Sequence, residues 1–293
     1  MRNKIFKTAF FGTPDFSAHL LKKLVEGKNL PIEIIGVVTQ PDKKVGRKQV
    51  VTPSPVKKLA QEKKIPILSD SRSTLRALRE VDLALLFAFG EILPSNTLSL
   101  PKHGFWNVHP SLLPLYRGAS PVATPLLNGD VETGVTIIKM DEELDHGPII
   151  DQKKTYIFPL QRRDQLTERL VDLAFEMLGE LFEKYAENMD AVHTTEQDHS
   201  NATYTKKLSK QDGYVEISNF KFQISNSSKQ LFNLFRGLYP WPGIWTLLPD
   251  KKRLKITKMH WENAKIVIKN VQLEGKNEIS FEEFERAYSI FKA

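Results

Sequence analysis

The sequence of 293 residues contains no cysteine. This absence excludes disulfide bonds and thiolate metal ligands, and with them the small scaffolds and zinc centres that depend on cysteine. Long hydrophobic runs are also missing, because no apolar stretch approaches the roughly 20 residues of a membrane-spanning helix. The opening residues Met1-Arg2-Asn3-Lys4 lead directly into a strand-like segment rather than a signal peptide. We therefore expect a cytoplasmic protein without a membrane partner.

Several common catalytic motifs are absent as well. The sequence has no G-x-x-x-x-G-K-[ST] loop, and no G-x-G-x-x-G follows the first predicted strand, so neither kind of nucleotide phosphate loop is indicated. It has no H-E-x-x-H motif, and His103, His109 and His146 do not have metal-ligand spacing. We therefore expect no metal site.

Positive charge is unevenly distributed along the chain, whose formal net charge is +7. Residues 206–293 hold 16 Lys and Arg against 9 Asp and Glu, whereas residues 1–205 hold 26 of each kind. A basic accessory domain beside a neutral domain favours a polyanionic substrate that is too large for a catalytic pocket. The alternative from charge alone is a solvated basic surface.

Strand-like and helix-like segments alternate over the first 190 residues. The predicted strands are 4–11, 32–39, 66–68, 83–89, 104–109, 134–140 and 149–157. The predicted helices are 17–26, 54–64, 74–80, 122–128 and 164–186. This alternation predicts an α/β domain, Rossmann-like, in which a mostly parallel sheet has helices on both faces. Residues 41–53, between the second strand and the second helix, are predicted as a long polar loop.

The chain becomes polar and loses its periodicity between residues 191 and 205, which predicts a linker. A helix at 227–238 and short strands at 245–248, 254–259 and 265–273 follow it. We therefore expect domains at 1–190 and 206–293, the first catalytic and the second small, basic and β-rich.

The most informative stretch is WNVHPSLLPLYRGASP at 106–121, followed 24 residues later by Asp145. Asn107 and His109 are two apart at the end of an apolar run, so on a strand their side chains face the same way. Pro110 cannot donate to a sheet and must end the strand. Either residue alone is more simply a turn cap or a core histidine, but together they resemble a catalytic site at a strand end.

The string resembles the folate-dependent formyltransferases, and among them most closely those that act on methionyl-tRNA. Further segments that carry the resemblance are FGTPDF at 11–16, TQPD at 39–42 with Gly46-Arg47, PSPVK at 53–57, FGEILP at 89–94, TYTKKLSK at 203–210 and YPWPG at 239–243. They occur in order and span most of the chain. The resemblance implies a monomeric enzyme of translation initiation, which transfers a formyl group from 10-formyltetrahydrofolate to the amino group of methionyl-initiator tRNA.

Formyl transfer between two nitrogens passes through a tetrahedral species, so it needs a donor for the developing oxyanion and a route for a proton. An amide can donate without titrating, which suits Asn107, and an imidazole can take a proton, which suits His109. Asp145 can orient the imidazole or relay the proton. By resemblance, these three residues are the catalytic ones.

The resemblance also implies binding residues. Ser111, Leu112, Leu113, Pro114 and Ile92 would line the folate pocket. Arg47 occupies a position implicated in tRNA contact, and Lys43, Lys44 and Lys48 surround it. The second domain is implied to be similar to a reduced oligonucleotide-binding barrel, because 254–261 and 265–273 nearly abut where the tRNA enzymes carry further strands.

Three alternatives stay open. Leu144-Asp145-His146-Gly147-Pro148 departs from the pattern of the tRNA enzymes and is closer to that of the glycinamide ribonucleotide formyltransferases, although the first turn lacks their phosphate-gripping loop. A second alternative is a formyltransferase acting on an amino sugar nucleotide. A third, from another class, is a folate- or tRNA-binding protein without catalysis.

Overall fold

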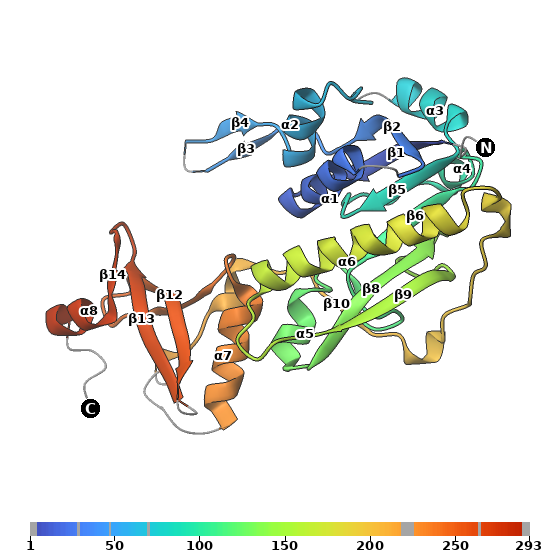
Figure 1. Ribbon diagram of the computed structural model, residues 1–293. Helices are drawn as coiled ribbons and strands as arrows, with labels where there is room; N and C mark the ends of the chain where they lie inside the picture. The colour runs from blue at the N-terminus through green and yellow to red at the C-terminus, as the bar shows by residue number, and fades with distance from the viewer. Residues whose placement is uncertain are drawn as a thin grey trace. The chain divides into compact units, whose positions relative to one another are not determined.

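The computed structural model describes residues 5–27, 30–46, 48–68, 71–217, 226–262 and 265–288. Arg47, expected in tRNA contact, lies outside them. The chain forms two compact units (Figure 1). The first comprises residues 1–118, 134–154 and 167–204, and the second comprises 119–133, 155–166 and 205–293. The expected domains at 1–190 and 206–293 stay a prediction. Two short segments that precede residue 190, namely 119–133 and 155–166, group with the C-terminal part of the chain.

A six-stranded sheet in the order β2-β1-β5-β6-β8-β9 forms the centre of the first unit. Its strands are β1 (Phe6–Gly12), β2 (Ile32–Val38), β5 (Leu83–Phe87), β6 (Phe105–His109), β8 (Glu132–Lys139) and β9 (Ile149–Tyr156). The four strands from β2 to β6 are parallel, and β8 is antiparallel to β6. The prediction of a mostly parallel α/β sheet is confirmed.

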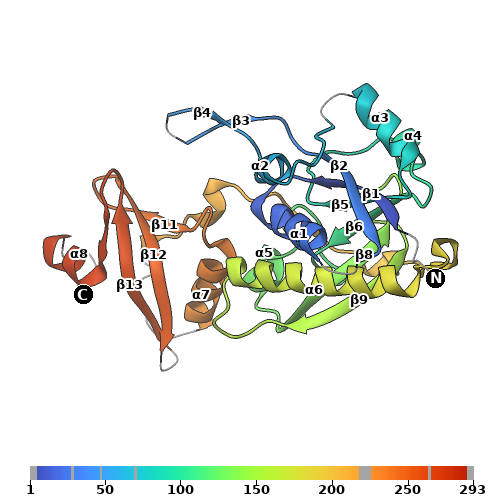
Figure 2. The same ribbon diagram turned by 45° about the horizontal axis from the view of Figure 1, so that its top comes forward.

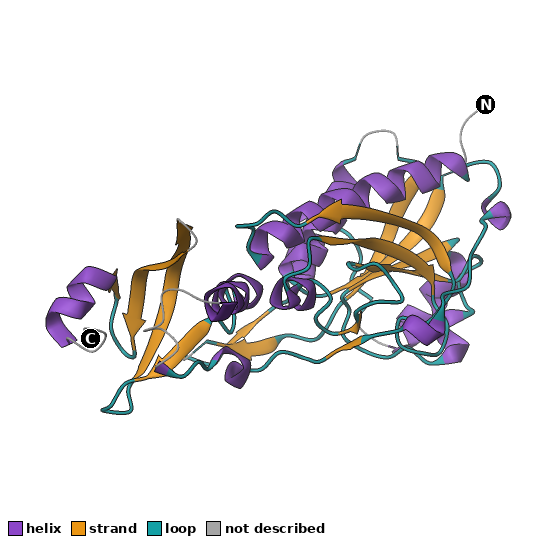
Figure 3. Cartoon of the chain, turned by 90° about the horizontal axis from the view of Figure 1, so that it is seen from below, coloured by secondary structure: helices purple, strands orange, loops and turns teal. Residues whose placement is uncertain are grey.

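Helices cover both faces of this sheet (Figures 1 and 3). They are α1 (Asp15–Glu26), α2 (Pro55–Glu62), α3 (Ser71–Glu80), α4 (Ser95–Leu98) and α6 (Arg163–Lys184). Because strand side chains alternate between faces, Phe6 of β1 and Trp106 of β6 contact Phe182 of α6 on one face. On the other face Phe11 and Phe105 belong to a buried cluster that includes Leu78 of α3. Asn107 and His109 point to the same side as Phe105.

The segment 41–53 is not the long loop that its polarity predicts. It contains an antiparallel hairpin of β3 (Lys43–Val45) and β4 (Val50–Thr52), which Figures 1 and 2 show projecting beyond α2. The reason is the β-branched Val45, Val50 and Val51 on either side of a Gly-containing turn, a hairpin signal masked by the intervening lysines. The helix after it begins as predicted, with Ser54 accepting from the Lys57 amide and Pro55 at the first position.

The segment 191–205, expected as a linker, contains regular structure and makes specific contacts. It contains a short 3-10 helix at His199–Asn201 and the strand β10 (Tyr204–Thr205), which pairs with β7 (Arg117–Gly118). Thr195 forms a bridge with Ile149 of β9. We call residues 195–204 the strap.

The second unit is built on a four-stranded antiparallel sheet in the order β11-β12-β13-β14. Its elements are α5 (Ala123–Asn128), α7 (Asn226–Leu238), β11 (Ile244–Leu247), β12 (Arg253–Glu262), β13 (Lys265–Leu273), β14 (Glu278–Ser280) and α8 (Phe281–Tyr288). Phe235 of α7, Leu254 of β12 and Phe284 of α8 share one buried cluster. The β-rich prediction is confirmed, and over the described residues the strands form an open sheet rather than a closed barrel. No helix within the described ranges is both long and apolar enough to cross a membrane.

Candidate active site

The parallel strands β1, β2, β5 and β6 end at one edge of the sheet, the usual place for sites in open α/β folds. Two hydroxyl groups hold the loops at this edge together. Thr13, which follows β1, donates through Oγ1 to the carbonyl oxygen of Phe89 at 3.0 Å, and Ser17 of α1 donates through Oγ to that of Phe87 at 2.5 Å. His109 is the last residue of β6, so it reaches the same edge.

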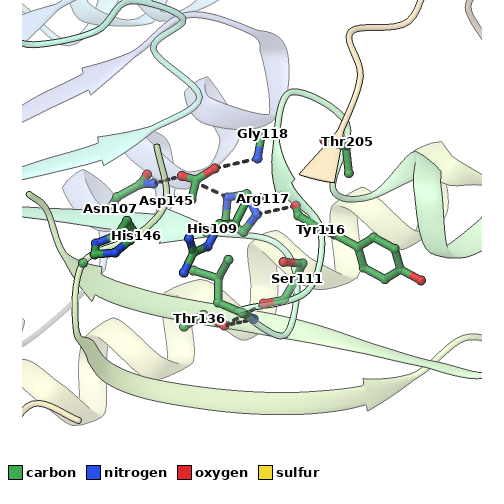
Figure 4. A network of polar contacts seen from close by, with 12 residues as sticks. Asn107, His109, Ser111, Tyr116, Arg117, Gly118, Thr136, Asp145, His146 and Thr205 are labelled. Carbon is green, nitrogen blue, oxygen red and sulfur yellow. Dashed lines mark hydrogen bonds and ion pairs between the residues drawn. The ribbon is translucent and has the colours of Figure 1, made fainter. Parts of the chain in front are cut away.

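The carboxylate of Asp145 lies between three nitrogens at this edge (Figure 4). The Asn107 amide donates from Nδ2 to Oδ1 at 3.0 Å, and the backbone N–H of Gly118 donates to Oδ2 at 2.7 Å. The Nδ1 atom of His109 lies 3.5 Å from Oδ1. The side chains of His109 and Asp145 are only 5% and 8% exposed. The structure therefore brings the three predicted catalytic residues together in a buried polar cluster.

The tautomer of His109 follows from its other nitrogen. Nε2 lies 3.0 Å from the carbonyl oxygen of Tyr116, and a carbonyl oxygen only accepts, so Nε2 carries a hydrogen. Nδ1 is then the nitrogen at which the ring gains or loses a proton, and it faces Asp145.

Asp145 sits in a tightly constrained turn. Its φ of 51° is in the left-handed region, which Asp adopts more readily than most residues. A Cβ built on Gly147 would overlap the carbonyl oxygen of Lys139, so this position has no room for a side chain. Beside it, His146 Nδ1 is 2.6 Å from Asp141 Oδ2. The turn therefore has little freedom to relax.

The loop 111–114, predicted to line the folate pocket, is held in place by hydrogen bonds to Leu115 and Thr136. Ser111 Oγ donates to the Leu115 carbonyl oxygen at 2.7 Å, and Thr136 Oγ1 accepts from the Leu113 amide at 3.1 Å. Ser111 and Leu113 are buried, whereas Leu112 and Pro114 are half-buried and Leu115 is exposed. Ser111 and Leu113 thus fix the conformation of the loop, and the accessible surface of the loop comes from Leu112, Pro114 and Leu115.

The segment after β5 presents an open surface at the same sheet edge. The Ile92 side chain is 88% exposed. Ala88 and Gly90 have φ of 53° and 88°, and a Cβ built on Gly90 would meet no atom within 4 Å. The backbone here faces open space, which fits the predicted approach of a flat ligand ring.

The predicted tRNA-binding lysines lie on a separate element. Lys43, Lys44 and Lys48 are exposed on the β3–β4 hairpin, whereas the predicted catalytic residues come from β6 and the turn at 145. Within the described parts of the chain, no group of three or more His, Asp or Glu side chains is arranged to hold a metal ion.

Several site residues were not found from the sequence. The Tyr116 carbonyl and the Gly118 amide act through the backbone, on which residue identity gives no information. Gln197 lies in a stretch predicted as a linker, yet it is buried and hydrogen-bonded to the turn at 145–147. Its partner Arg117 is 2% exposed. The sequence motif YRGASP at 116–121 contains Arg117, but the sequence alone indicated no function for this arginine.

The chain matches the family model of the formyl transferases over residues 6–181 and that of the formyl transferase C-terminal domain over residues 215–266. It is 35% identical to the methionyl-tRNA formyltransferase of Caldicellulosiruptor saccharolyticus, with 97% of each chain covered. It is 45% identical to that of Thermotoga neapolitana over 72% of this chain and 68% of the relative. Among solved structures, the sugar 3N-formyltransferase WlaRD, in the presence of dTDP and 5-N-formyl-THF, matches with a TM-score of 0.63 and 19% identity, covering 93% of this chain and 99% of that one. The last similarity concerns the fold alone.

Proposed function

This chain belongs to the methionyl-tRNA formyltransferase family, and from that membership we propose that it transfers a formyl group from 10-formyltetrahydrofolate to the free amino group of methionyl-initiator tRNA. The observation that carries the proposal is the Asn107–His109–Asp145 cluster at the carboxyl edge of the parallel strands. The product would serve translation initiation in the cytoplasm.

In this proposal Asn107 stabilises negative charge. Its Nδ2 group has two hydrogens, of which one is bonded to Asp145. We assign the other to the oxygen on which charge develops when the amine attacks the formyl carbon. Because the carboxylate fixes the amide orientation before the reaction, no reorganisation is needed in the transition state.

His109 and Asp145 would hold the proton that leaves the attacking amine, and would pass it to the folate nitrogen as the bond between that nitrogen and the formyl carbon breaks. The Tyr116 carbonyl fixes the ring so that Nδ1 takes up the proton beside the carboxylate. Asp145 keeps its place through the Gly118 amide and Asn107 while the charge on the ring changes. This division of roles resembles that of a base and its orienting carboxylate.

The residues present fit a folate. The co-substrate supplies an activated formyl group on a nitrogen, so the protein needs no nucleophile of its own. We propose that the segment 88–93 and the loop 111–115 hold the ring between them. The open space at Gly90, the exposed Ile92 and the rigidly supported loop support this placement. Apolar contacts would bind the ring faces and backbone groups its polar edge.

We propose that the β3–β4 hairpin contacts the acceptor end of the tRNA. Lys43, Lys44 and Lys48 are exposed on it. Arg47 stands next to Lys48 in the sequence. Flexible ammonium groups pair with phosphates, while a guanidinium can also stack on an unpaired base. The basic second unit would add phosphate contacts that do not depend on sequence.

The test is direct. The protein is incubated with 10-formyltetrahydrofolate and, separately, with methionyl-initiator tRNA, an amino sugar nucleotide or glycinamide ribonucleotide. Among these acceptors, we expect only methionyl-tRNA to give a formylated product. The Asn107→Ala variant should not form this product. Product with one of the small acceptors but none with methionyl-tRNA would refute the proposal, as would folate binding without any product.

A further inference from the structure

The strap contacts the two segments that hold Asp145, and Gln197 is its buried central residue. One segment is β7, which contains Arg117 and Gly118, and the Gly118 amide donates to Asp145 Oδ2. The other is the turn 145–147. Gln197 is 5% exposed and contacts both.

Both hydrogens of the Gln197 side-chain amide are used in hydrogen bonds. Nε2 lies 2.9, 2.9 and 2.8 Å from the carbonyl oxygens of Asp145, His146 and Gly147. An NH2 group has two hydrogens, so three successive carbonyl groups share them. The three carbonyl groups converge on this nitrogen, in a turn that is left-handed at Asp145. Without a donor there, three partly negative oxygens would converge on a buried, unsatisfied point.

Arg117 fixes which way the amide points. Its Nη2 donates to Gln197 Oε1 at 2.7 Å, and an arginine has only donors, so the amide oxygen must face it. Arg117 is held in turn by His199 Nδ1 at 2.8 Å and by the hydroxyl of Tyr204 at 3.4 Å. His199 stacks on His146 with centroids 3.9 Å apart. The oriented amide therefore connects β7 to the Asp145 turn.

We propose that Gln197 is a positioning residue of the catalytic site, and that it holds the Asp145 carboxylate against Asn107 and His109 through the backbone of residues 145–147. The proposal rests on the proposed formyl transfer, since it concerns the same carboxylate. A misplacement of about 1 Å at a catalytic group can lower a rate by about 100-fold. Because Gln197 acts on geometry and not on the substrates, its loss lowers kcat and leaves KM nearly unchanged.

The test uses two variants of the full-length protein. Gln197→Met keeps the length of the side chain and removes the donor. Gln197→Glu keeps an acceptor for Arg117 and places an oxygen against the three carbonyl groups. For both we expect kcat with methionyl-tRNA to fall by about 10- to 100-fold, with KM for either substrate within about threefold of the original. Circular dichroism and thermal unfolding show which variant is folded.

A double-mutant cycle separates positioning from a general structural role. In an Asp145→Asn background the carboxylate is already lost, so adding Gln197→Met is expected to change the residual kcat by less than about threefold. The matched control is Gln161→Met, which removes another buried glutamine, one that belongs to the second unit. We expect it to lower thermal stability and to retain kcat.

Three results would overturn the positioning role. They are an unchanged kcat in folded Gln197 variants, an equal loss of kcat in both backgrounds, and an equal loss in Gln161→Met. The wild-type protein in the same assay reports the underlying function separately. If the wild type forms no formyl-methionyl-tRNA, formyl transfer itself is contradicted, whereas wild-type turnover with full activity in the folded Gln197 variants contradicts positioning alone.

Discussion

At the scale of single residues, the proposed chemistry depends on one carboxylate with several partners, that of Asp145. Asp145 is contacted by Asn107 and His109 from the end of β6 and by Gly118 from the short strand β7. A carboxylate that accepts from fixed donors keeps its position when a neighbouring ring becomes charged. In the proposed mechanism the Asn107 amide and the His109 imidazole act in different ways on one reaction, and variants that remove each of them separately test this.

We predict that Asn107→Ala and His109→Ala each lower kcat by about 100- to 1,000-fold and change KM for the folate little. The reason is that both groups are proposed to act on charge that exists only in the transition state. Steady-state kinetics with methionyl-tRNA provides the measurement.

The matched control is His103→Ala. His103 is also buried and pairs with an aspartate, Asp190, at 3.2 Å, but it precedes β6 instead of ending it. This variant should lose stability and keep its kcat. If Asn107→Ala or His109→Ala changes only KM, these residues shape the pocket without taking part in the chemistry.

At the scale of elements, the sequence predicted the strands and helices that have a periodic hydrophobic pattern. It could not predict segments whose structure depends on contacts with residues distant in sequence. The apolar run at 104–109 gave β6, and its Pro110 gave the strand end, so Asn107 and His109 were placed correctly on one face. The hairpin at 43–52 was not predicted because its lysines make the segment polar overall, although three valines favour strands. The strap was missed because its order comes from Arg117 and the turn at 145–147, which are distant in sequence.

The short 3-10 helix at Lys210–Gly213 offers a test of one such local element. Asp212 accepts from the backbone N–H and the hydroxyl of Ser209, at 2.6 and 2.8 Å, and from Lys206. The Lys206 ammonium group, followed by the Ser209 donors, lowers the pKa of Asp212 from 3.8 to about 2. The carboxylate therefore contributes stability above pH 4, and this contribution is lost as the pH falls from about 4 toward 2.

We predict that Asp212→Asn lowers the free energy of unfolding at pH 7 by about 0.5–2 kcal/mol, as loss of a helix cap does. The difference from wild type should shrink progressively below pH 4, because protonation then removes the same interactions from the wild type. Urea unfolding between pH 3 and pH 7 measures it. A difference that stays constant to pH 3 would show that the charge on Asp212 is irrelevant.

The β3–β4 hairpin allows a prediction about substrate recognition. We expect Arg47→Ala to raise KM for methionyl-tRNA by about tenfold, since a phosphate or base contact is lost. The KM for the folate should not change, because the proposed folate contacts come from other segments. Lys102→Ala, which removes an exposed lysine of the same unit, is the control. Equal effects of the two changes would assign the role to overall charge.

At the scale of the whole molecule, most of the excess positive charge lies in the second unit. The second unit holds 18 Lys and Arg against 12 Asp and Glu, whereas the first holds 24 against 23. Deleting residues 206–293 is a poor test of this charge, because α7 packs against α5, which precedes the deleted part. Point changes at exposed lysines avoid that damage.

We predict that replacing Lys207, Lys210, Lys251 and Lys258 together by Gln weakens tRNA binding and flattens its salt dependence. Each lost contact with a duplex phosphate lowers the slope of log K against log salt by about 0.9. Binding measured between 50 and 200 mM salt gives the slope, and kcat at saturating tRNA should not change. An unchanged slope would mean that these charges are only solvated.

The crowding at Gly147 has a consequence for altering the acceptor range by directed evolution. Since any side chain there would collide with the Lys139 carbonyl, a library randomised at this codon would contain almost no active members besides glycine. Leu144 and Leu115 are 58% and 40% exposed, and they flank the Asp145 turn and the 111–114 loop in sequence. Diversity placed at those two leucines can change what approaches the amine site while the catalytic geometry is inherited intact.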